Sequence, residues 1–196
     1  DPFTIEITVN PTPIGVDDLK TICSGEVVNL NLKTTPIVFG TTYTYPAPTV
    51  TGGIIGGNPR IIDSTDDITD VLINPTGLVQ TAIYTVIPKS PDGCIGQPFT
   101  VEITVNPTPI GTDAFKTIYS GEAVNQNLRT NPITLGTTFT YPTPVMTGSL
   151  TGGTPRIIGS NNDITDVLIN PSSFTQTATY TVTPTSSQGC IGNPFN

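Results

Sequence analysis

Hydrophobic and polar residues alternate along short stretches of the chain, and prolines, glycines and asparagines separate these stretches. The pattern is clearest at 99–105, where the residues read FTVEITV. Alternation with a period of two is typical of β-strands that bury one face. The other stretches of this kind in the first half are 19–22, 26–32, 41–45, 61–62, 68–73 and 80–87. About seven short strands with regular turns predict an all-β, immunoglobulin-like β-sandwich.

The whole pattern occurs twice at a constant offset. Cys94 recurs as Cys190, which gives an offset of 190 − 94 = 96 residues. When residues 1–100 are aligned with residues 97–196, no gap is needed and 66 of the 100 positions are identical. A unit of this length matches one sandwich domain and exceeds the length of a solenoid repeat. The sequence therefore predicts tandem immunoglobulin-like β-sandwich domains, arranged head to tail.

The motif Asn-Pro-Thr-Pro follows the strand at 3–9 and the strand at 99–105. Proline lacks a backbone donor and cannot continue a β-ladder, so we place the domain boundaries at this motif. We expect domain 1 to span 10–105, domain 2 to span 106–196, and residues 1–9 to be the last strand of a preceding repeat. Domain 2 then lacks its own last strand, and the chain is expected to be part of a longer protein. A further hypothesis is that the first strand completes domain 2 of a neighbouring molecule by strand addition.

Composition and charge narrow the range of partners and activities. The chain has 7 Lys and Arg against 15 Asp and Glu, for a net charge of -8. With no basic stripe, nucleic acid and anionic membrane surfaces are not expected as partners, and no apolar run is long enough for direct membrane insertion. The chain has no histidine, which removes the usual general base near neutral pH and the usual zinc ligand. We expect no enzymatic activity and no cofactor apart from the calcium candidates below.

Two acidic stretches are candidate calcium sites: DSTDD at 63–67, and the pair Asp17 and Asp18 near the linker. Calcium prefers several oxygen ligands, and the first stretch offers three carboxylates: Asp63, Asp66 and Asp67. The counterpart GSNND at 159–163 loses two of these carboxylates, so a solvated turn is the competing interpretation. Near the linker, Asp17 and Asp18 form a second acidic pair, but domain 2 keeps only the first of them, as Asp113.

Tyrosines offer one further candidate site. Tyr84 and Tyr180 lie in equivalent strands, where we expect core packing with the hydroxyl bonded to the backbone, as in a tyrosine corner. The alternative for Tyr43, Tyr45 and Tyr141 is an exposed face on which sugar rings stack.

Several motifs together resemble a known family. They are TICSGE at 21–26, QTATYTVTP at 176–184, GCIGNPF at 189–195 and FTVEITVNPTP at 99–109. In combination they resemble the PKD-like and immunoglobulin-like repeats of giant Bacteroidetes surface proteins, such as SprB-type gliding adhesins. The resemblance covers both repeats. It implies an extracellular, outer-membrane-attached parent protein that is exported by the type IX system. The parent is then expected to interact with the gliding machinery and with a substratum or polysaccharide.

The three cysteines leave the disulfide scheme open. Cys23 lies just before one strand of the first sheet, and Cys94 lies in the turn before the last strand, at the opposite end of the domain. Strands of about seven residues at about 3.3 Å each separate these two ends by roughly 20 Å, whereas a disulfide needs Cα atoms within about 7 Å. In a head-to-tail chain Cys23 would face Cys190 of the next repeat, and this pairing is the preferred prediction. The alternatives are a Cys23–Cys94 bond within domain 1 and three free thiols. Tyr119 replaces the first cysteine in domain 2.

Overall fold

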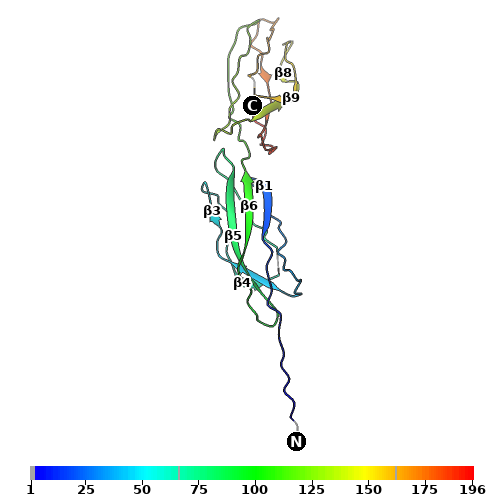
Figure 1. Cartoon of the computed structure of the whole chain (residues 1–196). Coiled ribbons are helices and arrows are strands. Elements are labelled where there is room, and N and C mark those ends of the chain that lie inside the picture. Colours follow the sequence, from blue (N-terminus) through cyan, green and yellow to red (C-terminus); the bar gives the residue numbers. More distant parts are fainter. Residues whose placement is uncertain (1–2, 66, 162) are drawn as a thin grey trace. The chain divides into compact units, whose positions relative to one another are not determined.

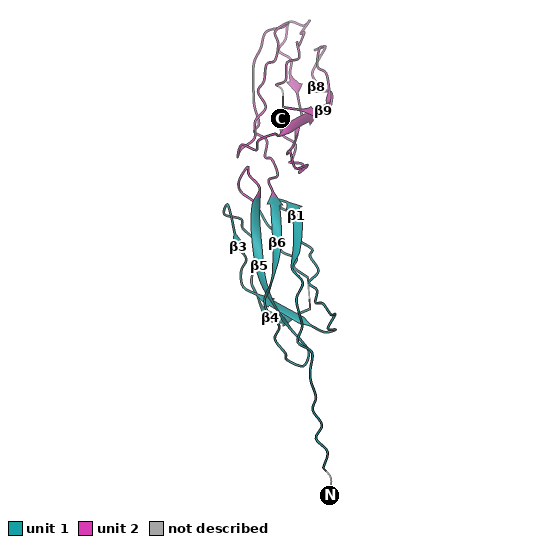
Figure 2. Ribbon diagram, viewed as in Figure 1, with its two compact units in different colours: residues 1–73, 80–105 teal, residues 74–79, 106–196 magenta. Residues whose placement is uncertain are grey.

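The chain forms two all-β units. The computed structural model describes residues 3–65, 67–161 and 163–196. One unit (unit 1) comprises residues 1–73 and 80–105, and the other (unit 2) comprises residues 74–79 and 106–196 (Figure 2). The secondary structure in the described part of the chain consists of strands only. The all-β prediction is therefore confirmed. Among the described residues, no helix is long and apolar enough to cross a membrane.

Unit 1 contains a six-stranded sheet of order β1-β6-β5-β2-β4, with β3 also paired to β5 (Figure 1). The two longest strands, β5 and β6, form an antiparallel hairpin in which Tyr84 lies opposite Val101. The last strand of unit 1, β6, therefore lies between the first strand, β1, and β5. The bounds are β1 Asp18–Cys23, β2 Thr42–Tyr45, β3 Thr49–Val50, β4 Arg60–Ser64, β5 Gln80–Lys89 and β6 Phe99–Asn106.

Alternating side chains of these strands form the core of unit 1. On β6 every second residue is buried, as the period-two pattern predicts. On β5 the same holds for Ala82, Tyr84 and Val86, which are fully buried. Ile68 and Leu72, which lie outside the strands of the sheet, are buried in the same core. Burying side chains of this size is the main stabilising contribution to the fold.

The expected strands at 26–32 and 68–73 are present only as isolated bridges, and here the sequence prediction is wrong. Val27 pairs with Val71 and Leu30 pairs with Ile68, both antiparallel. Between them, Asn29 has a φ of 41°, in the left-handed region that interrupts an extended ladder. Its carbonyl accepts a hydrogen bond of 2.8 Å from the Lys20 side chain rather than from a partner strand. The two segments therefore lie side by side in antiparallel directions without forming a continuous ladder.

Unit 2 repeats this architecture with shorter strands. Its core contains the counterparts of the unit 1 core residues, including Phe139, Tyr141 and Tyr180. Asn125 has a φ of 44° and interrupts the same pair of segments as in unit 1. The strands pair as β10-β8 and as β11-β7-β9. Their bounds are β7 Thr138–Tyr141, β8 Val145–Met146, β9 Arg156–Ser160, β10 Ala178–Thr179 and β11 Thr183–Thr185.

Candidate functional site

A buried tyrosine of unit 1 bonds to a half-buried aspartate. The Tyr84 hydroxyl, on β5, donates a 2.7 Å hydrogen bond to Oδ2 of Asp70, which also accepts a 3.3 Å bond from the Asn58 backbone N–H. Burial raises the pKa of the Tyr84 phenol, and the bond to Asp70 raises this pKa further. The tyrosine was expected to bond to backbone, as in a tyrosine corner. Its partner is instead a carboxylate, so this part of the prediction is wrong.

An aromatic–arginine stack adjoins this pair. The Tyr45 ring meets the Tyr84 ring edge-on, with centroids 5.3 Å apart, and the Arg60 guanidinium carbon lies 4.9 Å from the Tyr45 centroid. The Arg60 side chain also donates a 2.6 Å hydrogen bond to the backbone carbonyl of Asp67. Tyr43 and Tyr45 are both 5% exposed. They are therefore core residues and do not form the sugar-stacking face that was the alternative for them.

The same cluster occurs in unit 2. Tyr180 donates a 2.7 Å bond to Asp166, and the rings of Tyr141 and Tyr180 meet edge-on with centroids 5.4 Å apart. Arg156 lies 4.9 Å from the Tyr141 centroid. Tyr141 is buried as well. Sequence reasoning missed the two aspartates, although each is a charged residue inside an apolar segment, ITDVLI, at the same distance from its tyrosine in both repeats.

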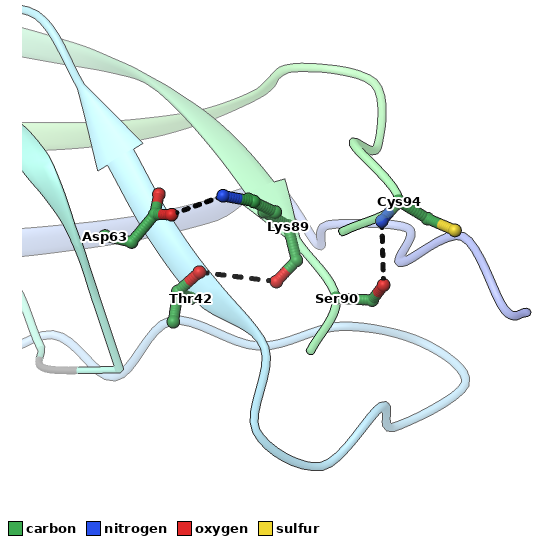
Figure 3. A network of polar contacts seen from close by, with 5 residues as sticks. All are labelled: Thr42, Asp63, Lys89, Ser90 and Cys94. Carbon is green, nitrogen blue, oxygen red and sulfur yellow. Dashed lines mark hydrogen bonds and ion pairs between the residues drawn. The ribbon is translucent and has the colours of Figure 1, made fainter. Parts of the chain in front are cut away.

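The acidic stretch at 63–67 is engaged with neighbouring side chains. Lys89 Nζ forms an ion pair with Asp63 Oδ2 at a distance of 2.7 Å (Figure 3). Asp67 Oδ1 accepts a 2.8 Å bond from the Asn31 amide, and Asp66 lies outside the described residues. Among the described residues, no three carboxylates or cysteines gather in a metal-binding cluster. Calcium binding at Asp63, Asp66 and Asp67 stays a prediction, and the solvated turn stays the alternative to it.

The other acidic pair, near the linker, also has partners. Asp17 Oδ1 accepts hydrogen bonds from the backbone N–H and the hydroxyl of Thr100. Asp18 bonds to the backbone N–H of Leu19. In unit 2, Asp113 Oδ1 accepts the equivalent bond from the Asn196 backbone N–H. These carboxylates therefore connect the start of each repeat to the segment that follows its last turn.

The three cysteines are in two different states. Cys23 and Cys190 are disulfide-bonded, and Cys94 is a free, half-buried thiol. Cys94 lies in the turn after β5, where its backbone N–H donates a 3.1 Å bond to Ser90 Oγ (Figure 3). Cys190 makes the equivalent 3.0 Å bond to Ser186, so the turn is the same in both repeats.

The position of β1 separates the two cysteines of unit 1. The bond between Asp17 and Thr100 places the start of β1 beside the start of β6, and Cys23 is the last residue of β1. Cys94 precedes β6, so it lies beyond the other end of this strand pair. Six strand residues span about 20 Å, which is too far for a bond between these two cysteines. The pairing of Cys23 with Cys190 stays a prediction.

A hollow of about 600 Å³ opens on unit 1 beside the segment 34–41. Its lining is mainly apolar and includes Val16, Leu32 and Ile37. The ring of Phe39, which also lines it, is 87% exposed. Among the residues that the structure describes, the lining holds one cation, Lys33, and no carboxylate. The hollow can therefore accept an apolar or ring-shaped group.

Comparison with models of known protein families identifies the domain type of the two repeats. The family model of the PKD-like domain matches residues 20–109 and matches again at residues 116–196. The chain belongs to the PKD-like domain family. Each PKD-like match covers one repeat, which confirms that the two halves are copies of one domain type. The comparison with curated proteins returned no match.

Among solved structures, the chain is similar to a protein from Bacteroides ovatus. That structure is SGBP-B of the mixed-linkage glucan utilization locus, in complex with a mixed-linkage heptasaccharide. Sequence identity is 12%, the match covers 98% of this chain, and the TM-score is 0.25. The PKD-like chain spans 44% of the length of that protein. A similarity at this level assigns no ligand to the PKD-like repeats.

Proposed function

We propose that the chain is a spacer: two PKD-like repeats of an extended extracellular stalk that presents an adhesive part of a surface protein. In this proposal a disulfide between Cys23 and Cys190 joins one repeat to the next. The observation that carries the proposal is the state of the cysteines: one bonded cysteine in each repeat, and a free thiol at Cys94. Disulfides persist in oxidising surroundings, which supports an extracellular location.

A covalent bond across the junction and the Asn-Pro-Thr-Pro linker at 106–109 would both restrict bending between repeats. Stiffness is the property that a stalk under tension needs. We further propose that the parent protein is a cell-surface filament of the gliding-adhesin kind, attached at the outer membrane and exported by the type IX system. The motif resemblance supports this last step.

The test is a non-reducing peptide map together with small-angle scattering, with and without a phosphine reductant. We expect a peptide that links Cys23 to Cys190, and we expect reduction to broaden the distribution of end-to-end distances. Alkylation of the unreduced protein should label Cys94 alone. A peptide map that links Cys23 to Cys94 would refute the proposed disulfide between the repeats. Scattering that reduction leaves unchanged would refute the proposal that this disulfide restricts bending.

Direct binding of a polysaccharide is the second candidate function, and the hollow beside Phe39 favours it. An exposed aromatic ring next to an apolar hollow offers a surface on which a sugar ring can stack. The equivalent residue in unit 2 is Leu135, which provides a matched control. If this function holds, a glycan array detects binding that Phe39→Ala abolishes and Leu135→Ala preserves. No binding by the unsubstituted chain on such an array would exclude the candidate for the glycans tested.

A further inference from the structure

Two exposed side chains of different chemistry line the hollow beside the segment 34–41 of unit 1. Phe39 offers an aromatic ring that is 87% exposed, and Lys33 offers an exposed ammonium group. The volume of the hollow, about 600 Å³, lies within the range of about 300–1,000 Å³ that is usual for ligand sites. The hollow therefore combines room for a small ligand with one flat apolar contact and one charged contact.

The charge of Lys33 is available to a ligand. Within the part of the chain that the structure describes, no carboxylate forms an ion pair with Lys33. Two carboxylates on neighbouring segments are engaged with other side chains: Asp63 pairs with Lys89, and Asp67 accepts a 2.8 Å bond from the Asn31 amide. An anionic group that enters the hollow thus meets a cation, and no acid among the described lining residues opposes it.

Buried threonines hold the segment 34–41 in shape. The Thr34 hydroxyl oxygen accepts a 3.2 Å hydrogen bond from the Val38 N–H, and the Thr41 hydroxyl donates a 2.7 Å bond to the Val38 carbonyl. Both threonines are at most 7% exposed, so water competes little for these bonds. The backbone that carries Phe39 is therefore ordered before a ligand arrives, which lowers the entropic cost of binding.

Unit 2 repeats this segment without the aromatic ring. Equivalent threonine bonds, of 3.0 Å and 2.7 Å, hold the corresponding residues 130–137. The position of Lys33 is taken by Arg129, which is also exposed, and the position of Phe39 is taken by Leu135. Leucine gives apolar contact but has no flat face on which a ring can stack. The second repeat therefore keeps the cation and serves as a control for the ring.

We propose that the hollow of unit 1 binds a uronate residue of an acidic polysaccharide, with the sugar ring against Phe39 and the carboxylate against Lys33. This inference rests on the second candidate function, direct binding of a polysaccharide, and names its ligand class. In a uronate the carboxylate is bonded directly to a ring carbon, so a ring that stacks on Phe39 holds its charge within the hollow. The net charge of -8 does not prevent this, because charges beyond about 8 Å are largely screened at physiological ionic strength.

The test is titration calorimetry of the full chain with three oligosaccharides of equal length: an oligogalacturonate, its neutral galactose counterpart and a sulfated galactan. We expect the oligogalacturonate to bind most tightly, and its affinity to fall as salt is raised. Lys33→Gln should lower this affinity about fivefold at low salt without changing that of the neutral sugar. Lys33→Arg should retain the affinity. Arg129→Gln removes the equivalent exposed cation of unit 2 and should change nothing.

Substitutions at the ring position test the other contact. Phe39→Leu makes the segment resemble that of unit 2 and should abolish binding. Leu135→Phe gives unit 2 the same pair of groups and should raise the stoichiometry from one to two. Both side chains are at least 73% exposed, so both units remain folded. Binding that survives Phe39→Leu, or a stoichiometry that stays at one in Leu135→Phe, would overturn recognition by a ring and a cation together.

The oligosaccharides separate failure of this inference from failure of polysaccharide binding itself. Equal affinity for the acidic and neutral sugars, with no effect of Lys33→Gln, would overturn the uronate assignment and leave polysaccharide binding in place. Tighter binding of the sulfated galactan would overturn the choice of a carboxylate as the anionic group. If none of the three sugars binds, the uronate assignment and the second candidate function both fail.

Discussion

Replacing Tyr84 with phenylalanine tests whether the partly buried tyrosine–aspartate bond stabilises unit 1. The substitution keeps the ring, and with it the edge-on contact to Tyr45, and removes only the hydroxyl that donates 2.7 Å to Asp70. A hydrogen bond to a charged partner contributes about 1.5–3 kcal/mol. Tyr84 is fully buried but Asp70 is half-buried, so water that reaches the carboxylate offsets part of the loss. We expect the free energy of unfolding of unit 1 to fall by about 1.5 kcal/mol, the lower end of that range. For a domain of this size the melting temperature should fall by on the order of 10 °C.

The same bond makes stability depend on alkaline pH. The phenol titrates near pH ~10 in the unfolded chain, and burial raises the pKa of Tyr84 in the folded state. Stability is therefore fully present below pH ~10. Above that pH the unfolded state loses the proton while the folded state retains it. The free energy of unfolding should then fall by up to about 1.4 kcal/mol per pH unit for each such tyrosine. In Tyr84→Phe, this fall should be smaller for unit 1.

Calorimetry of the wild type, Tyr84→Phe and Tyr180→Phe at several pH values measures both effects. Tyr180→Phe is the matched control because its bond to Asp166 is also 2.7 Å long, and it should change the transition of unit 2 instead. If Tyr84→Phe unfolds within about 0.5 kcal/mol of the wild type and keeps the same alkaline slope, the assigned role of the bond is wrong.

Three further results follow from the geometry. Gly56→Ala should cost about 2–4 kcal/mol, measured by urea unfolding, because φ is 101° and a Cβ there would lie 2.0 Å from a backbone carbonyl oxygen. Gly53→Ala should cost only about 1 kcal/mol, because φ is 72° but no atom lies within 4 Å, and equal costs would contradict the clash. Titration calorimetry should detect no calcium binding at Asp63, whose carboxylate pairs with Lys89, and a stoichiometric heat would show that calcium displaces the lysine. A maleimide should label Cys94 without reductant, and failure to label it would place this thiol in a disulfide.

The period-two pattern predicted the strands that pair along their length, because alternate burial leaves a direct trace in the sequence. It predicted a continuous strand at 26–32 as well, and this failed at Asn29, whose left-handed backbone is invisible to a hydrophobic pattern. The hydrophobic pattern could not predict the hydrogen-bond partner of Tyr84 either. Asp70 is fourteen residues away and on another segment, so only the three-dimensional pairing brings the two side chains together.

The central place of β6 has a consequence for folding. Its partner β1 lies about eighty residues earlier in the chain, as the bond between Asp17 and Thr100 shows. Contacts of such long sequence separation form slowly, so each repeat remains incomplete until its last strand has left the ribosome. During that interval a nearly identical strand from another repeat competes for the same place. Synthesis of one repeat ahead of the next therefore reduces the exchange of strands between neighbours, and refolding of the whole chain from denaturant lacks this protection.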